Sequence, residues 1–251
     1  MLFSLMRLVF GDAREWKYLV ESLAALIDEA CFKVTPDGLT LRALDPSRIA
    51  MVDLSLPQTA FDEFECDEET IIGVNFEELR KVMKRARKDE KVELSTVAGR
   101  FKVKIIGRAE RTFSLPILDI PSEELPAVKV DFKVRARMLS DSLKDALSDA
   151  NLVSDAVKFE ATEDLLRVYA SSDKGEVTVD FSLISGSLLE YEVQENSVAS
   201  YSLEYLLDMV KKASALSDVV TVEFATEKPI SLTFEIAGGG ILRYFLAPRA
   251  G

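Results

Sequence analysis

The second half of this sequence repeats the plan of its first half, and this repeat is the feature that most constrains the fold. The segment LRALDPSRIAMVDLSL (Leu41 to Leu56) is echoed by LLRVYASSDKGEVTVDFSL (Leu165 to Leu183), since both begin near an LR pair and end on a V-D-[Leu/Phe]-S-L strand. The stretch Val74 to Leu94 is echoed by Tyr201 to Phe224, each placing a helical pattern before a β-branched strand. Matching landmarks lie roughly half a chain apart, which indicates two copies of one domain rather than a short-period solenoid.

Length and composition agree with two domains. The 251 residues are 48% hydrophobic, enough for two cores of ordinary size. The stretch from Leu115 to Pro126 contains three prolines and several acids without a helical or strand period, which is typical of an extended linker. We therefore expect an N-terminal domain over residues 1–117, a connector over 118–128 and a C-terminal domain over 129–251.

Hydrophobic periodicity predicts α+β domains. Helices are expected from Asp12 to about Asp28, within Val74 to Leu94, from Leu139 to Ala150 and within Tyr201 to Phe224. Strands are expected at residues 2–10, 31–34, 39–44, 49–56, 91–95, 100–106, 111–115 and 130–136. Near the C-terminus, Gly238 to Gly240 separate two further strands as a hairpin.

One of these helices is unusually basic. Its apolar stripe comprises Phe76, Leu79, Val82, Met83 and Ala86. The cations that lie mostly outside the stripe are Arg80, Lys81, Lys84, Arg85, Arg87 and Lys88. Asn75 is suited to cap the helix, and cations towards the C-terminal end suit its dipole. A solvated face is the ordinary interpretation of such a charge run, and binding to a polyanion is the alternative.

The remainder of the chain is acidic. The net charge of −12 disfavours adhesion of the whole surface to nucleic acid, so any role on DNA must be local and geometric. No segment has the pattern of a signal peptide or a membrane span, which predicts a soluble, cytoplasmic protein without a membrane partner. Cys31 and Cys66 are expected to be free thiols, with one disulfide as the alternative.

The strand from Ile49 to Leu56 has apolar residues on both faces at its beginning. Ala50, Val52, Leu54 and Leu56 alternate to one face, whereas Ile49 and Met51 share the other face with Asp53 and Ser55. Either another part of the chain covers Ile49 and Met51, or they belong to a partner site. The apolar run from Leu242 to Pro248 near the C-terminus poses the same question.

Catalytic motifs are scarce. The sequence has no histidine, which removes imidazole acid–base chemistry and the common metal clusters, and the three consecutive glycines are not followed by GK[ST]. Asp45 with Asp53, or the acids of the helix from Leu139 to Ala150, could be paired carboxylates of an enzyme, but abundant surface acids are the simpler explanation. We expect no enzyme activity, no cofactor and no metal.

The sequence closely resembles the sliding clamps of archaea and eukaryotes, the proliferating cell nuclear antigen family. The resemblance rests on the two-repeat plan, on DEACFKVTPDGLTLRALDPSRIAMVDLSL, on GVNFEELRKVMKRA and on the C-terminal ILRYFLAPR, and it covers essentially the whole chain. It implies a ring of three subunits, each of two α+β domains, with helices lining the hole and sheets outside. Such a ring encircles duplex DNA without regard to sequence and tethers enzymes of replication and repair.

The resemblance assigns the cations to the lumen of the ring. Lys17, Lys81, Lys84 and Lys212 match lumen positions, and neighbouring cations that could reach the DNA backbone are Arg14, Arg80, Arg85, Lys88 and Lys211. The helix from Leu139 to Ala150 departs from this pattern. It is expected to bury Leu139, Leu143, Ala146 and Leu147 but to show Asp141, Asp145 and Asp149 with only Lys144 positive.

The resemblance also implies two contact surfaces. The residues that match a pocket for short hydrophobic-aromatic peptides of DNA polymerase, clamp loader, flap endonuclease and ligase are Leu44, Ile49, Met51, Leu125, Pro229, Phe245, Ala247 and Pro248. Subunits would join through edge strands, with Arg111, Phe113 and Leu115 beside Val177 and Val179 of the next subunit. Homotrimers, heterotrimers and a structural oligomer without DNA all remain open at this point.

Overall fold

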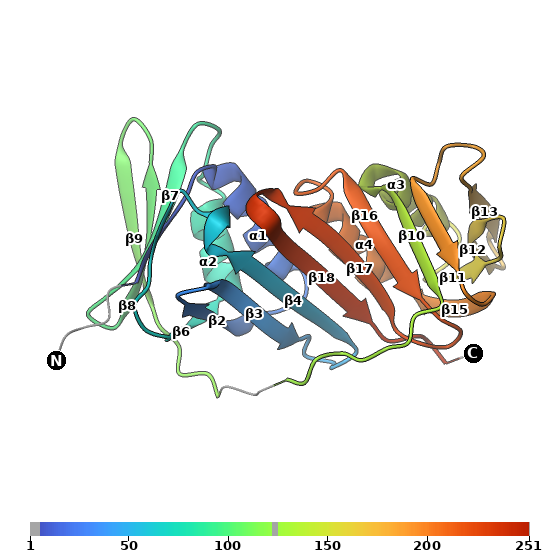
Figure 1. The fold of residues 1–251 in the computed structure, drawn as a ribbon, viewed down its shortest axis with the longest axis horizontal. Coiled ribbons are helices and arrows are strands. Elements are labelled where there is room, and N and C mark those ends of the chain that lie inside the picture. Colours follow the sequence, from blue (N-terminus) through green and yellow to red (C-terminus); the bar gives the residue numbers. More distant parts are fainter. Residues whose placement is uncertain (1–5, 122–124, 251) are drawn as a thin grey trace. The chain divides into compact units, whose positions relative to one another are not determined.

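The computed structural model describes residues 6–121 and 125–250. The chain divides into two compact units. Unit 1 is Met1–Pro46, Val52–Leu125 and Ile236–Leu242, and unit 2 is Ser47–Met51, Pro126–Glu235 and Arg243–Gly251. Both units contain two helices and antiparallel strands, so the two similar α+β domains predicted from the repeat are confirmed (Figure 1).

Unit 1 contains two helices, α1 (Ala13–Ala24) and α2 (Phe76–Met83), which pack against each other. Its strands are β1 (Arg7–Phe10), β2 (Glu29–Thr35), β3 (Gly38–Leu44), β4 (Ala50–Pro57), β5 (Glu63–Glu65), β6 (Thr70–Asn75), β7 (Lys91–Val97), β8 (Arg100–Ile106) and β9 (Glu110–Pro116). A short 3₁₀ helix, η1, follows β4 at Gln58–Ala60. One sheet has the order β5-β1-β7-β8-β9, and β4, β3, β2 and β6 are consecutive neighbours in another.

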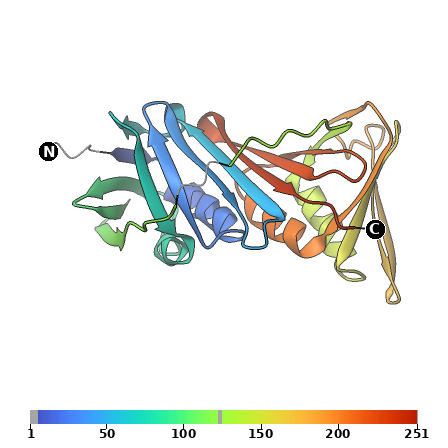
Figure 2. The ribbon, with the colours of Figure 1, turned by 90° about the horizontal axis from the view of Figure 1, so that it is seen from below.

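Unit 2 repeats this plan with the helices α3 (Ser140–Ala150) and α4 (Leu203–Ala213). Its strands are β10 (Val134–Leu139), β11 (Ala156–Ala161), β12 (Leu166–Ser172), β13 (Gly175–Phe181), β14 (Glu190–Val193), β15 (Ser197–Ser202), β16 (Val219–Phe224), β17 (Ile230–Ile236) and β18 (Gly240–Leu246). A 3₁₀ turn, η2 (Ala237–Gly239), joins the last two; it and the first residues of β18 are part of unit 1. One sheet has the order β13-β12-β11-β15, and β14, β10, β16, β17 and β18 are consecutive neighbours in another; the helices of each unit lie on one face of its strands (Figure 2).

Each unit has an aromatic core beneath its helices. In unit 1, Trp16 of α1 packs on Phe32 with ring centroids 6.0 Å apart, and Phe32 packs edge-on against Phe76 of α2 at 5.5 Å. In unit 2, Phe159 makes similar edge contacts with Tyr201 and with Phe224. All these side chains are fully buried, which anchors the helices whatever charges their outer faces carry.

Several expected boundaries were wrong. α1 ends at Ala24 rather than near Asp28, and the strand expected at residues 130–136 is β10, Val134–Leu139. Leu139 is half exposed rather than buried. It is the N-cap residue of α3, so its side chain lies outside the apolar stripe of the helix. The first strand is observed from Arg7, and residues 2–5 lie outside the described residues.

The expected linker begins with a contact that its sequence did not predict. Leu118 donates its backbone N–H to the carbonyl of Gly73 on β6 at 2.9 Å. A Cβ atom at position 73 would lie only 2.1 Å from the Leu118 carbonyl oxygen, so glycine is required for this approach. The first residues of the linker are therefore attached to the edge of β6 in unit 1.

Candidate nucleic-acid and partner interfaces

The basic helix is shorter than its periodicity suggests. The side chain of Asn75 accepts the N–H of Glu78 at 2.9 Å, as expected for the cap, but α2 ends at Met83 and Lys84 is its C-cap residue. Arg85 and Ala86 continue as a turn, with their N–H groups bonded to Val82 and Met83. The cations of this segment are therefore divided between the last turn of α2 and the chain that follows it.

The cations after α2 are solvated and unpaired. Lys84, Arg85 and Lys88 are exposed, and within the described parts of the chain no carboxylate lies within ion-pair distance of them. Arg80 is half-buried. Lys84 lies at the negative end of the helix dipole, which favours a cation there. Lys84, Arg85 and Lys88 therefore present positive charge that forms no ion pair within the described residues.

Lys81 behaves differently from its neighbours. Its ammonium lies 2.8 Å from a carboxylate oxygen of Glu78 and 3.3 Å from one of Glu77. The hydrogen bonds to Glu78 and Glu77 raise the pKa of Lys81 above its ordinary value. Lys81 is thus charged at neutral pH, but two carboxylates on its own helix offset much of its field.

The other helices carry fewer exposed cations. On α1, Lys17 and Arg14 are half-buried, and Arg14 pairs with the N-cap residue Asp12 at 3.2 Å. Lys211 and Lys212 are exposed in the last turn of α4. Burial, followed by the charge of Glu204, raises the pKa of Asp208 above its ordinary value. Lys211 and Lys212 act in the opposite direction, so the Asp208 carboxylate lies within the field of both cations.

The first helix of unit 2 is acidic, as its sequence predicted. Asp141, Asp145 and Asp149 are exposed on α3, and Lys144 pairs with Asp141. Asp149 lies at the C-terminal end of α3, where the helix dipole disfavours a negative charge. No basic residue occupies the last turn of α3.

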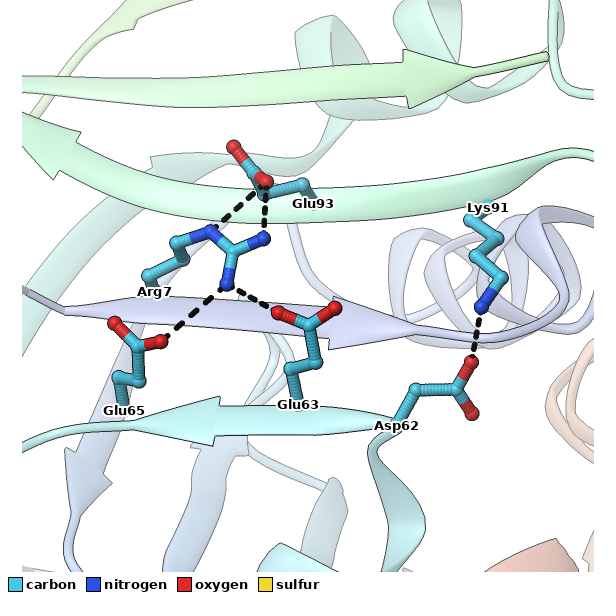
Figure 3. A network of polar contacts seen from close by, with 6 residues as sticks. All are labelled: Arg7, Asp62, Glu63, Glu65, Lys91 and Glu93. Atoms are coloured by element: carbon cyan, nitrogen blue, oxygen red, sulfur yellow. Dashed lines mark hydrogen bonds and ion pairs between the residues drawn. The ribbon is translucent and has the colours of Figure 1, made fainter.

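Most cations on the strands are paired with acids. Arg7 on β1 contacts Glu93 on β7 at 2.9 Å, Glu63 at 2.5 Å and Glu65 at 3.4 Å on β5, beside a Lys91–Asp62 pair (Figure 3). The hydrogen bond to Glu63 raises the pKa of Arg7, with smaller contributions from Glu93. Further pairs on the strands are Lys33–Glu69, Arg42–Asp53, Lys104–Glu110, Arg135–Glu190, Arg137–Glu190 and Arg167–Asp180.

Most of the expected peptide pocket lies within unit 2. Ile49 is 41% exposed, whereas Met51 and Phe245 are only 6% and 8% exposed, so of the two alternatives the chain itself covers Met51. Pro229, Ala247 and Pro248 are half-buried. The N–H of Ala247 donates to the carbonyl of Ile49 at 2.8 Å, which joins the C-terminal segment to the start of the apolar strand. Ile49 is thus a surface side chain beside buried apolar ones.

The remaining pocket residues, Leu44 and Leu125, lie in unit 1 and are half-buried. The guanidinium of Arg42 donates to the carbonyl of Leu125 at 3.3 Å and to Asp53 at 2.6 Å. Arg42 therefore holds the far end of the linker to β3. Neither the charge of Arg42 nor the alternation of residues along β3 predicted this contact from the sequence.

The expected subunit-contact residues lie on two sheet edges. Arg111, Phe113 and Leu115 are half-buried on β9, and Val177 and Val179 are half-buried on β13. Among the described residues β9 pairs only with β8, and β13 pairs only with β12. Each strand therefore has one row of backbone N–H and C=O groups without a strand partner in the described chain.

The arrangement does not favour carboxylate catalysis. Asp53 is held by Arg42, Asp45 is buried, and a cleft in unit 1 is lined by other residues, Pro36, Gln58, Phe64, Glu65, Cys66 and Asp67. The described residues contain no cluster of metal-ligating side chains, and both cysteines are free thiols, as predicted. Within the same residues, no helix is both long and apolar enough to cross a membrane.

Two repeated α+β units, each with a helix pair on antiparallel sheets, define a protein of the DNA-clamp class. The family model described as "Proliferating cell nuclear antigen, N-terminal domain" matches residues 5–112, and the model of the C-terminal domain of the same antigen matches residues 127–249. The chain belongs to the proliferating cell nuclear antigen family. This confirms the resemblance inferred from the sequence motifs.

Similar proteins of archaea are named as DNA polymerase sliding clamps. A DNA polymerase sliding clamp of Thermofilum pendens is 49% identical over 98% of this chain and 99% of its own length, and DNA polymerase sliding clamp 1 of Pyrobaculum aerophilum is 46% identical over 96% and 97%. The crystal structure of PCNA from Thermococcus kodakaraensis matches with a TM-score of 0.93 at 30% identity, covering 97% of this chain and 100% of the other. A structure of the PCNA2–PCNA3 complex of Sulfolobus tokodaii matches at 0.91 and 31%, covering 98% and 100%.

Proposed function

We propose that this chain is one subunit of a three-membered ring that encircles duplex DNA in the cytoplasm, at the nucleoid, and acts there as a processivity factor without catalytic activity. The observation that carries the proposal is the division of positive charge between paired and unpaired sites. Cations on the strands are largely paired with acids, whereas Lys84, Arg85 and Lys88 have no ion-pair partner in the described residues. Positive charge is therefore available beside a helix in a chain of net charge −12.

This charge pattern suits sliding on DNA. Lysine and arginine contacts to phosphates are independent of sequence, and they weaken as salt rises because they release counterions. A few such contacts hold the duplex without fixing the register, while the acidic remainder repels it. DNA contacts are assigned first to Lys84, Arg85 and Lys88, with Lys17, Arg80, Lys211 and Lys212 in support.

A test of encirclement uses the topology of the DNA. The clamp is loaded by its clamp loader onto a nicked circular plasmid, unbound protein is removed, and one half of the sample is then cut with a restriction enzyme. A ring stays on the circle and slides off the cut DNA. Equal retention on both forms would contradict encirclement.

The assembly is proposed to close through β9 of one subunit and β13 of the next. Pairing these strands satisfies their unpaired backbone groups and removes two exposed edges. Light scattering over a dilution series tests whether this chain is sufficient alone. A mass near three subunits supports a homotrimer. If the chain alone is a monomer and reaches the mass of three subunits only after related subunits are added, the ring is a heterotrimer. If it remains a monomer even with related subunits, the proposed ring is contradicted.

The second proposed site receives short hydrophobic-aromatic peptides of DNA polymerase, clamp loader, flap endonuclease and ligase. Its support is the exposed Ile49 side chain and the backbone bond that joins Ala247 to Ile49, in the same unit as the half-buried Pro229 and Pro248. An aromatic side chain that covers Ile49 removes apolar surface from water, at about 25 cal/mol per Å².

The pocket is tested by Ile49→Asp against a control of similar exposure, Ile71→Asp on β6, since the two side chains are 41% and 48% exposed. We expect the affinity for a synthetic peptide with one aliphatic and two aromatic residues to fall about tenfold or more in Ile49→Asp, because a charge at the contact must lose water. The control keeps the wild-type affinity. Equal titrations for all three proteins would remove Ile49 from the site.

A further inference from the structure

The segment that follows β18 is held at two places in unit 2. Ala247 donates its N–H to the carbonyl of Ile49 at 2.8 Å, and Arg249 donates its N–H to the carbonyl of Ser200 on β15 at 2.7 Å. Pro248 lies between them and has no N–H to donate. The segment therefore connects the start of the apolar strand to the edge strand β15, and these two backbone bonds lie on either side of Pro248.

The side chain of Arg249 adds a third attachment. Its Nη1 lies 3.2 Å from Oδ2 of Asp155 and 3.4 Å from the backbone carbonyl oxygen of the same residue. Asp155 directly precedes β11, and its carbonyl also accepts the N–H of Leu203 at the start of α4. The guanidinium is thus bound to a point that β11 and α4 already fix in place.

This ion pair is too exposed to contribute much to the stability of the whole domain. The Arg249 side chain is 44% exposed and the Asp155 side chain is 86% exposed, and such surface pairs are screened by water and salt. A segment held by two backbone bonds and one surface pair, however, opens locally at a much lower free energy than the core. A weak interaction therefore changes the docked fraction of this segment several-fold while leaving global unfolding unchanged.

We propose that the Arg249–Asp155 pair is a latch that docks the C-terminal segment and thereby holds Ala247 and Pro248 in the peptide pocket. Arg249 is then a positioning residue, which acts on the peptide through the backbone of its neighbours. The inference rests on the proposed peptide site and adds that an ion pair outside the site controls its shape. Because the latch is electrostatic, part of the affinity for an uncharged apolar peptide depends on salt.

The test compares Arg249→Gln and Asp155→Asn with Arg135→Gln. The control removes a surface ion pair in the same unit, Arg135–Glu190, whose side chains are 38% and 45% exposed. Hydrogen exchange measures docking at the amides of Ala247 and Arg249, and fluorescence anisotropy measures binding of the uncharged hydrophobic-aromatic peptide at low and high salt. Both are recorded on the assembled protein.

We expect each latch variant to speed exchange at the two amides and to weaken peptide binding by about threefold to fivefold at low salt. At high salt the difference from the wild type shrinks, because screening already opens the wild-type latch. Arg249→Lys restores part of the docking, since it keeps the charge near Asp155. Arg135→Gln matches the wild type in both measurements.

Three results would overturn the latch. Unchanged exchange in Arg249→Gln shows that the backbone bonds dock the segment alone, and faster exchange with unchanged peptide affinity shows that docking does not shape the pocket. A loss of affinity that is equal at low and high salt, with no recovery in Arg249→Lys, shows a role for the arginine other than its charge. If the wild type itself binds no peptide, the proposed peptide site fails, while the exchange data still test the ion pair.

Discussion

The α2 segment of unit 1 and helix α3 of unit 2 each pack against the other helix of their unit, but they carry opposite surface charge. Each buries an apolar stripe, with Phe76 and Leu79 on α2 and Leu143 and Leu147 on α3. The last turn of α2 and the residues after it are basic, whereas α3 exposes Asp145 and Asp149. The fold requires only the buried stripe, so the outer face of each helix is free to differ.

If the chain binds DNA as proposed, this difference in charge predicts that the two units contribute unequally. Unit 1 provides unpaired cations after α2, and unit 2 provides Lys211 and Lys212 together with an acidic helix. The proposed grip on the duplex is therefore uneven around each subunit. Four sets of substitutions, in order of decreasing expected effect, test this inequality.

The largest effect is expected from Lys84→Glu combined with Arg85→Glu. The double reversal removes two unpaired cations from every subunit and adds two negative charges that repel phosphate. The amount of clamp loaded on nicked circular DNA should fall about tenfold or more. Lys129→Glu, an exposed reversal outside the helices, serves as the control, and a double variant that loads like this control would contradict the assignment.

A smaller effect is expected from Lys211→Glu combined with Lys212→Glu. Glu204 and Asp208 on the same helix already reduce the field of these lysines, so their reversal removes less attraction. Loading should fall about threefold in the same assay, and its dependence on salt should become weaker. A loss as large as that of the α2 variant would mean that the two units contribute equally.

An increase in loading, rather than a decrease, is expected from Asp145→Asn combined with Asp149→Asn on α3. The variant should load about twofold more efficiently, since two repulsive charges are removed from each subunit. Its thermal unfolding temperature should also rise slightly, because the unfavourable interaction of Asp149 with the helix dipole costs roughly a few tenths of a kcal/mol. Glu163→Gln with Asp164→Asn in an exposed turn is the matched control, and loading that drops in the α3 variant would show that these acids serve DNA or a partner.

The smallest effect is expected from Lys81→Gln. The Lys81 ammonium must leave Glu77 and Glu78 before it can contact a phosphate directly, so loading should change by less than about twofold, whereas Lys84→Gln should lower it more. The comparison of these two single variants separates a paired from an unpaired lysine on one helix. A stronger effect at Lys81 would mean that DNA competes successfully with the two glutamates.

Prediction from the sequence succeeded where local periodicity decides the structure. The stripe of α2, its Asn75 cap and the alternation of Ala50, Val52, Leu54 and Leu56 are all observed. It left the outcome open where burial depends on distant segments. Met51 shares a strand face with Ile49 but is 6% exposed, because alternation gives the face of a side chain and not what covers that face.

The sequence predicted where the cations are concentrated but not which contacts their side chains make. The run of cations after Asn75 identified the basic segment, but the pairing of Lys81 with Glu77 and Glu78 depends on side-chain geometry. Arg42 and Arg249 were missed because each contacts a residue far away in the sequence, Leu125 and Asp155 respectively.

The sequence by itself determined that this chain has two similar α+β domains, that its positive charge is concentrated after Asn75 and that it belongs among the sliding clamps. These properties depend on repeats, composition and motifs, which a linear chain carries in full. Only the tertiary structure decided which cations are unpaired, which strand edges lack a neighbour and how the segment after β18 is attached. The physical reason is that ion pairs, edge pairing and burial join residues far apart in the chain, so no local pattern records them.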